Sequence, residues 1–200
     1  MRWIAQPQRR GKRPGQSGQG AVEFALVGGL FFFLVFSIVN GGFFLYGRAA
    51  VQHAADVGVS LLSTEGNCMS YTAGGLCLVL PANCPNAGDA ATADAVAVCM
   101  MDQQGFDSTP LVKVTSIAIW KVTESGGVFT TVTSGCSGPC EQVYDVMGNT
   151  VLNNWPPSSR VVVGSPDFAE LQVTFSYRLI ATSGSLSMTT DNVFRMEPQQ

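Results

Sequence analysis

An uninterrupted apolar run from Phe24 to Tyr46 constrains this chain of 200 residues more than any other feature. The run holds 23 residues without a charge. As an α-helix it would extend about 34 Å, more than the roughly 30 Å of a bilayer's hydrocarbon core. Backbone polar groups in lipid must be satisfied within the segment, so we expect a transmembrane helix over about 24–46. A buried helix of a soluble protein would need other apolar segments around it, and the sequence offers none.

Basic residues are concentrated before this run. Residues 1–18 carry five of the 11 basic residues and no acid, which leaves six basic and 14 acidic residues, a net charge of −8, for 19–200. The positive-inside rule then predicts a cytoplasmic N-terminus and an exported body. We interpret the basic stretch as a topology signal, and we expect no nucleic-acid partner.

The start of the chain differs from an ordinary secretory signal peptide. Such peptides have an apolar core of about 7–15 residues that ends in small residues. Here the core is longer and ends in the bulky residues of 43–46. The small residues lie before the core instead, and this places the candidate processing junction there.

Gly18 is followed by four residues and then by Glu23 and Phe24, which lead directly into the apolar run. This spacing resembles a type IV prepilin processing site. The stretch GQGAVEFALV, with GRAAVQHAADVG after the run, is similar to the TadE-like family of the tight-adherence (Flp) pilus system. The resemblance covers about residues 16–60. It implies cleavage between Gly18 and Gln19 by a prepilin peptidase, with Glu23 as the acid at the fifth mature position.

Two residues depart from the patterns of related pilins. Phe24 stands where the major Flp pilins usually have tyrosine. Gln19 replaces the phenylalanine or methionine common at the first mature position of other type IV pilins, which leaves N-methylation of the new terminus open.

The physical chemistry of Glu23 agrees with this resemblance. A carboxylate at the edge of the hydrocarbon costs a few kcal/mol unless it is paired. After cleavage, the new amine of Gln19 would lie one helical turn away, on the same helix or on a neighbouring one. A pair between subunits would offset the cost and set the axial register. Alternatively, Glu23 only favours the helix N-terminus, a dipole effect of about 0.3–1 kcal/mol.

Small residues recur along one side of the apolar run, in the pairs Ala25/Gly29 and Ser37/Gly41. Such pairs let membrane helices approach closely, although glycine is frequent in membrane helices in any case. We expect a bend or local melting at 40–42, where two glycines follow an asparagine.

The segment 47–62 continues with helical periodicity, and we expect it to form an exported stem that ends near 64–67. His53 is the only histidine in the chain and has no partner at metal-ligand spacing, so we expect it on a solvated helix face. Neither a metal nor another cofactor is expected.

The remainder predicts a small α+β head. After a loop over 67–87, an alanine-rich helix is expected at 89–104, with Asn86 or Asp89 as N-cap and Gly105 at its end. Alternation of apolar and polar residues then predicts an antiparallel sheet, interrupted by a loop at 153–157. Its expected strands are 111–122, 128–133, 170–179 and 186–196. In 170–179 one face should hold Leu171, Val173, Phe175, Tyr177 and Leu179.

Six cysteines all follow the apolar run, and an even set in the exported part predicts disulfides. They are Cys68, Cys77, Cys84, Cys99, Cys136 and Cys140. Six cysteines allow 15 pairings. Cys136 and Cys140 could close a local loop, and the other four could tie the 67–87 loop to the helix that carries Cys99.

The sequence contains no motif for catalysis, phosphate binding or calcium binding. We expect a lollipop-shaped pilin-like protein with a basic cytoplasmic leader (1–18), a transmembrane helix and stem (19–62) and a periplasmic head (63–200). The expected function is that of a non-enzymatic minor pseudopilin in the bacterial inner membrane. The expected partners are a prepilin peptidase, other pilus subunits and assembly-platform proteins, with no small-molecule substrate. The alternatives are a pseudopilin of a secretion or DNA-uptake machine and a membrane-anchored periplasmic binding module.

Overall fold

The computed structural model describes residues 17–68, 84, 92–106, 108–180 and 183–197. The chain divides into two compact units, residues 1–41 and residues 42–200. We call residues 42–200 the head; this unit includes the segment 47–62 predicted as a stem, which packs with the sheet.

The first helix, α1, runs from Ser17 to Glu65. It contains the whole predicted apolar run, and its C-terminal end agrees with the break predicted near 64–67. The helix is continuous through 40–42, so the local melting that we considered there is not observed. The boundary between the two compact units nevertheless falls at this point, after Gly41.

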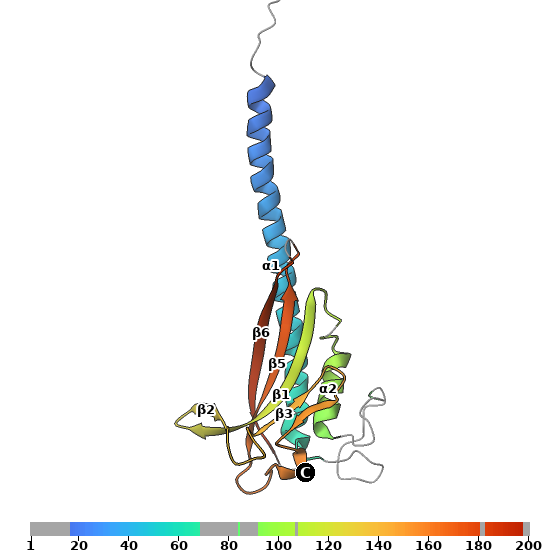
Figure 1. Cartoon of the computed structure of the whole chain (residues 1–200), viewed down its shortest axis with the longest axis vertical. Coiled ribbons are helices and arrows are strands. Elements are labelled where there is room, and N and C mark those ends of the chain that lie inside the picture. The colour runs from blue at the N-terminus through green and yellow to red at the C-terminus, as the bar shows by residue number, and fades with distance from the viewer. Residues whose placement is uncertain (1–16, 69–83, 85–91, 107, 181–182, 198–200) are drawn as a thin grey trace, which may run out of the picture. The chain divides into compact units, whose positions relative to one another are not determined.

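The head contains one antiparallel sheet, with the strand order β4-β3-β1-β5-β6 and with β2 paired to β1 (Figure 1). Four of its strands were predicted within a few residues of their observed ends. The short strands β3 and β4 were not predicted. The observed strands are β1 (Val112–Ser125), β2 (Val128–Thr131), β3 (Glu141–Tyr144), β4 (Thr150–Asn153), β5 (Phe168–Arg178) and β6 (Ser185–Arg195).

A register shift in β1 explains why its apolar residues change phase. Val114 pairs with Phe175, whereas Ser116 pairs with the next residue of β5, Thr174. Two residues of β1 therefore oppose one step of β5, as in a β-bulge. Before the shift the buried positions are even-numbered, as at Val114, and after it they include Ile117.

The turn between β1 and β2 centres on two glycines. Gly126 and Gly127 have φ values of 62° and 82°. Positive φ at both central residues is the requirement of a two-residue type I′ hairpin, which glycine meets without steric cost.

Strand β5 alternates between buried and half-exposed residues. This confirms the predicted inward face at Leu171, Val173, Phe175 and Tyr177, all of which are almost fully buried. Leu179 lies after the end of the strand.

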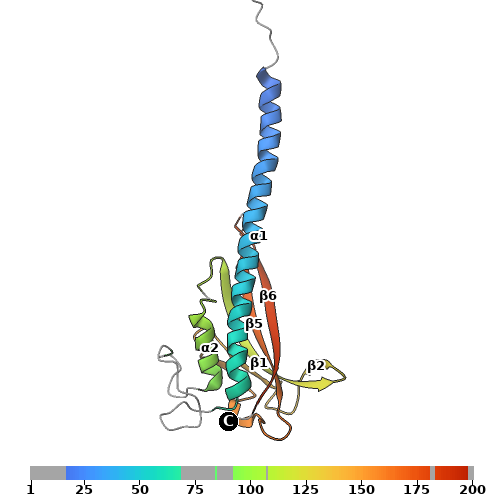
Figure 2. The ribbon, with the colours of Figure 1, turned by 180° about the vertical axis from the view of Figure 1, so that it is seen from behind.

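The inward face of the sheet packs against two helices, the C-terminal part of α1 and the helix α2 (Ala93–Gln103), which lie on the same side of the sheet (Figure 2). α1 carries Gly58 where it passes α2 and β5. An added Cβ at Gly58 would lie 2.8 Å from the sulfur of Met101 and 3.2 Å from Leu171, so only glycine fits without displacement. The core also includes Val51, Ala54, Ala55, Leu62, Val96, Phe106, Trp155 and Met196.

Helix α2 begins later than predicted. Its N-cap is Thr92, whose hydroxyl accepts a hydrogen bond from the Ala95 amide, so the proposed caps Asn86 and Asp89 were wrong. Both residues lie outside the described part of the chain. The predicted stop is confirmed, since Gly105 follows the helix with φ of 76°. A long apolar helix followed by an antiparallel sheet is the predicted α+β, pilin-like fold.

Candidate functional site

The proposed processing junction lies in the first turn of α1. The helix begins at Ser17, so the backbones of Gly18 and Gln19 are both helical. Apart from the backbone of its own helix, nothing in the described part of the chain lies within 4 Å of a Cβ added at Gly18 or at Gly20. Glycine in a helix lowers stability by about 1 kcal/mol relative to alanine, and here no intramolecular contact requires it. Packing within the described residues therefore does not account for the glycine at position 18.

Glu23 and Phe24 follow the junction on the same helix, and both are exposed. The Phe24 side chain is 79% exposed. They begin a surface of exposed, large apolar side chains along 24–46. This surface includes Leu26, Leu30, Phe31, Phe32, Phe33, Phe36, Ile38, Leu45 and Tyr46, all of which are exposed by more than half.

An exposed apolar surface of this size is unfavourable in water, since each fully exposed side chain of this type forgoes about 1.5–3 kcal/mol of burial. Within the described residues, α1 is the one helix long and apolar enough to cross a membrane. The exposed surface and its length together support a single-pass membrane protein.

The small residues Ala25, Gly29 and Ser37 lie on the exposed side of α1, and Gly41 is partly exposed. A Cβ added at Gly29 or Gly41 would meet nothing within 4 Å, so these positions leave room for another helix. The Ser37 hydroxyl donates a hydrogen bond to the Phe33 carbonyl, 2.8 Å away, and is therefore satisfied within its own helix. The use of this track for packing between subunits stays a prediction.

The polar side of the predicted stem is not simply solvated. Gln52 donates a hydrogen bond to Asn192 of β6 at 3.0 Å and accepts one from Thr190. Asn192 in turn donates to Asp56 at 3.0 Å. These bonds join the helix to the edge strand of the sheet, and sequence periodicity could not reveal a partner 140 residues away. His53, by contrast, is exposed as expected.

A buried charged cluster, formed by Asp94, Tyr144 and Arg160, was also missed. Arg160 contacts Asp94 through both terminal nitrogens and also donates to the carbonyl of Gly66 at 2.8 Å. The Tyr144 hydroxyl donates to Asp94 at 2.8 Å. Burial, together with the negative charge of Asp94, raises the pKa of Tyr144 far above its ordinary value.

This cluster is closed to substrates. The side chains of Arg160 and Asp94 have no solvent exposure, and the Arg160 guanidinium lies 4.8 Å from the centroid of the buried Trp155 ring. Its position between α1, α2 and the segment after β4 makes it a structural connection between elements.

The cysteine pairing agrees with the prediction as far as the described residues reach. Disulfides join Cys84 to Cys99 and Cys136 to Cys140. Cys68 is disulfide-bonded as well. Cys77 lies outside the described residues. The Cys84–Cys99 bond ties the segment before α2 to the helix itself.

No group of three or more His, Cys, Asp or Glu side chains in the described residues could hold a metal ion. The features that distinguish this chain are the predicted processing junction at Gly18, the exposed apolar face of α1 and the head. A family model described as TadE-like protein matches residues 18–60. No curated protein and no solved structure matches the chain.

Proposed function

We propose that this chain, which is similar to the TadE-like family over residues 18–60, is a minor pseudopilin of a tight-adherence pilus. A prepilin peptidase processes it after Gly18. The processed protein then takes part in pilus assembly without an enzymatic role. The observation that carries the proposal is the junction itself. Gly18, Glu23 and Phe24 stand at prepilin spacing at the start of an exposed apolar helix, inside the segment that matches the family.

The structure supports this function through the two surfaces of α1. Residues 24–46 expose apolar side chains that a bilayer or other pilin helices would cover. Residues 51–62 bury their apolar side chains in the head. One helix therefore provides both an apolar surface for assembly and part of the core of the head, and we expect these two roles of the first helix of a pilin-type subunit.

The mass of the mature N-terminus tests the proposal. The full chain is expressed in bacteria with and without the prepilin peptidase of a tight-adherence system, and the purified protein is measured by intact-mass spectrometry. We expect a product that begins at Gln19 only when the peptidase is present. An intact chain from Met1 as the main species in the presence of the peptidase would contradict the proposal.

A matched pair of variants shows whether the glycine is required. Gly18→Arg places a long charged side chain beside the scissile bond and should block processing. Gly15→Arg adds the same charge within the leader, three residues upstream, and should leave cleavage intact. Loss of cleavage in both variants would mean that added charge, and not the glycine, controls processing.

The two alternatives are separated by different measurements. A pseudopilin of a secretion or DNA-uptake machine would share the junction, so the accompanying ATPase and peptidase genes distinguish it. A membrane-anchored binding module would need no cleavage. A mature chain that begins at Gln19 therefore speaks against this alternative, and an intact N-terminus supports it.

A further inference from the structure

We propose that a pocket at one corner of the sheet, where β1 begins and β5 ends, binds the phosphate of an anionic phospholipid headgroup, with Lys113 and Arg178 as its cationic ligands. The proposal depends on α1 crossing a membrane and is independent of the pilus function.

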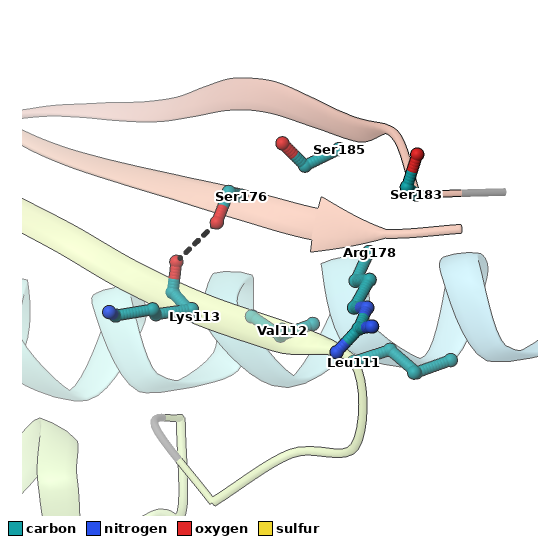
Figure 3. Close-up of a pocket in the computed structure, with 7 residues that line it drawn as sticks. All are labelled: Leu111, Val112, Lys113, Ser176, Arg178, Ser183 and Ser185. Atoms are coloured by element: carbon teal, nitrogen blue, oxygen red, sulfur yellow. Dashed lines mark hydrogen bonds between the residues drawn. The ribbon is translucent and has the colours of Figure 1, made fainter. Parts of the chain in front are cut away.

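The pocket lies on the face of the sheet that points away from α1 and has a volume of about 370 Å³ (Figure 3). Strand register explains its composition. Lys113 pairs with Ser176, and Arg178 pairs with Ser185, so these side chains share one face. Figure 3 shows Arg178 extending from the end of β5 toward Leu111 at the start of β1, Lys113 extending along β1 away from Arg178, and the hydroxyls of Ser183 and Ser185 on the β6 side. The lining residues are Leu111, Val112, Lys113, Ser176, Arg178, Ser183 and Ser185.

The corner lies beside the end of the apolar run. Within the head, the Phe44 ring packs edge-on against Tyr177, with the ring centroids 5.4 Å apart. The backbone of Gly47 approaches Val112 so closely that an added Cβ would lie 2.5 Å from it. Gly47 is one residue beyond Tyr46, a rise of about 1.5 Å. The headgroup layer on each side of the hydrocarbon is about 5–8 Å deep, so the pocket lies at headgroup depth.

Charge at this corner opposes that of the rest of the chain. The segments that meet there, 42–48, 108–116, 174–180 and 183–189, contain three basic residues and no acid, although residues 19–200 carry a net charge of −8. In sequence the nearest acid is Asp107, outside the described residues. Two other basic residues of the head are already paired, Lys121 with Asp167 and Arg160 with Asp94. Lys113 and Arg178 are exposed and form no ion pair with any residue that the structure describes.

Backbone strain marks the same corner. Leu111 has φ of 67°, which makes it the one non-glycine residue with positive φ in the described chain. Pro110 precedes it, and the Val112 amide donates to the Thr109 carbonyl at 3.2 Å, as in a type II turn. That turn favours glycine or asparagine at the position of Leu111. Strained residues of this kind cluster at ligand sites. The Leu111 carbonyl accepts the Arg178 amide at 2.8 Å, so the strained turn positions the arginine.

The donor set suits a phosphate group better than a carboxylate. Arg178 offers two parallel N–H groups to phosphate oxygens, and Lys113 offers a mobile point charge. The hydroxyls of Ser183 and Ser185 add neutral donors. The acyl chains of the same lipid would run along the exposed side chains of Phe43 and Leu45, which are 41% and 64% exposed. Two cations at one site select an anionic headgroup over a zwitterionic one.

Lipid titration of the full chain tests the proposal. The protein is purified in neutral detergent, and binding of short-chain phosphatidylglycerol is measured by native mass spectrometry, with short-chain phosphatidylcholine and inorganic phosphate as separate arms. We expect phosphatidylglycerol to bind at least tenfold more tightly than phosphatidylcholine. Lys113→Gln/Arg178→Gln should weaken phosphatidylglycerol binding at least tenfold, and Arg178→Lys should weaken it less.

Arg195→Gln is the matched control, because this exposed arginine lies at the other end of the sheet, where it pairs with Phe168. It should leave lipid affinity unchanged. Equal affinity of the wild type and the double variant would overturn the proposal. Binding of inorganic phosphate as tight as that of the lipid would also overturn the proposal, since the site would then bind free anions. The thermal unfolding midpoint of each variant must equal that of the wild type. If the double variant has a lower midpoint, the lipid affinity of Arg178→Lys, compared with that of the wild type, tests the proposal instead.

Discussion

The guanidinium of Arg160 holds the carboxylate of Asp94 with two bonds, Nη1 to Oδ1 at 2.5 Å and Nη2 to Oδ2 at 2.6 Å. The two residues are 66 positions apart, and neither side chain is accessible to solvent. Asp94 lies in the first turn of α2, where the helix dipole favours a negative charge. Arg160 also donates a hydrogen bond to the carbonyl of Gly66, just after α1. One cation therefore connects the end of α1 to the start of α2.

Removing the cation should strongly destabilise the head. Arg160→Met leaves Asp94 buried without its charged partner, and breaking such a pair from one side typically costs about 3–5 kcal/mol. The free energy of unfolding, measured by chemical denaturation of the full chain in detergent, should fall by this amount.

The double variant Asp94→Leu/Arg160→Met provides the control. It removes both charges together, so it should recover most of the stability that Arg160→Met loses. If the double variant is as unstable as the single one, the loss comes from packing around Trp155 and not from the uncompensated carboxylate.

The two described disulfides should differ in their contribution. A bond that closes a longer loop restricts the unfolded chain more. Cys84 and Cys99 are 15 positions apart, whereas Cys136 and Cys140 are four apart. Replacing the first pair by serine should lower the free energy of unfolding by about 3 kcal/mol, and replacing the second by about 2 kcal/mol. Paired unfolding curves measure the difference. Free thiols at these positions in native protein, detected by alkylation and mass spectrometry, would contradict both disulfides.

Local sequence patterns were sufficient for the elements with strong periodicity. The alternation of 170–179 predicted which side of β5 faces the core, because a strand buried on one face repeats every two residues. The paired glycines at 126 and 127 suit a tight hairpin turn, since few other residues adopt positive φ twice in succession. The length and apolar character of 24–46 predicted a membrane-spanning helix, because this prediction depends only on the composition of the segment itself.

Interactions between distant segments were not predictable. Arg160 and Asp94 each look like ordinary surface residues in sequence, and nothing local indicates that they meet. The same holds for Gln52, which binds β6. The short strands β3 and β4 were missed because four residues are too few for a periodicity to emerge. The pocket at Lys113 and Arg178 likewise exists only through the pairing of β1 with β5.

Acid should weaken the loop that follows β3. The side-chain amide of Asn149 donates to Asp145 and lowers the pKa of that carboxyl, with help from the amides of Met147 and Asn149. Because the folded pKa is below the unfolded one, the stabilisation is complete above the ordinary aspartate pKa of about 3.9 and is lost as the pH falls through the folded value.

The variant Asp145→Asn should isolate this contribution. At pH 7 we expect it to be less stable than the wild type by about 0.5–1 kcal/mol, a small amount because the loop is exposed. At pH 3 the difference should narrow, since the wild-type carboxyl is then partly protonated. Thermal unfolding midpoints at the two pH values measure it. Asp102→Asn makes the same substitution at an exposed position of α2 and controls for the substitution itself. A constant difference for Asp145→Asn would refute the assignment.

Glu23 separates a pilin-type role from a simple anchor. If α1 only tethers the head, Glu23→Leu removes a costly charge from the edge of the span and should preserve membrane insertion and function. If subunits instead pack with Glu23 against the terminal amine of a neighbour, insertion and cleavage should continue while assembly fails. The amine at Gln19 would then enter the helix bundle without its partner, a loss of about 3–5 kcal/mol, which is enough to prevent incorporation.

The assay is the recovery of this protein with the other pilus components after crosslinking in cells. Glu23→Asp is the matched control, because it keeps the charge on a shorter side chain and should retain part of the wild-type recovery. We expect Glu23→Leu to insert normally, to be cleaved to a chain beginning at Gln19, and to be absent from the crosslinked assembly. Equal recovery of wild type and Glu23→Leu, with normal piliation, would leave the anchor as the one role that agrees with the result, because an unpaired buried amine could not have been tolerated in a packed bundle.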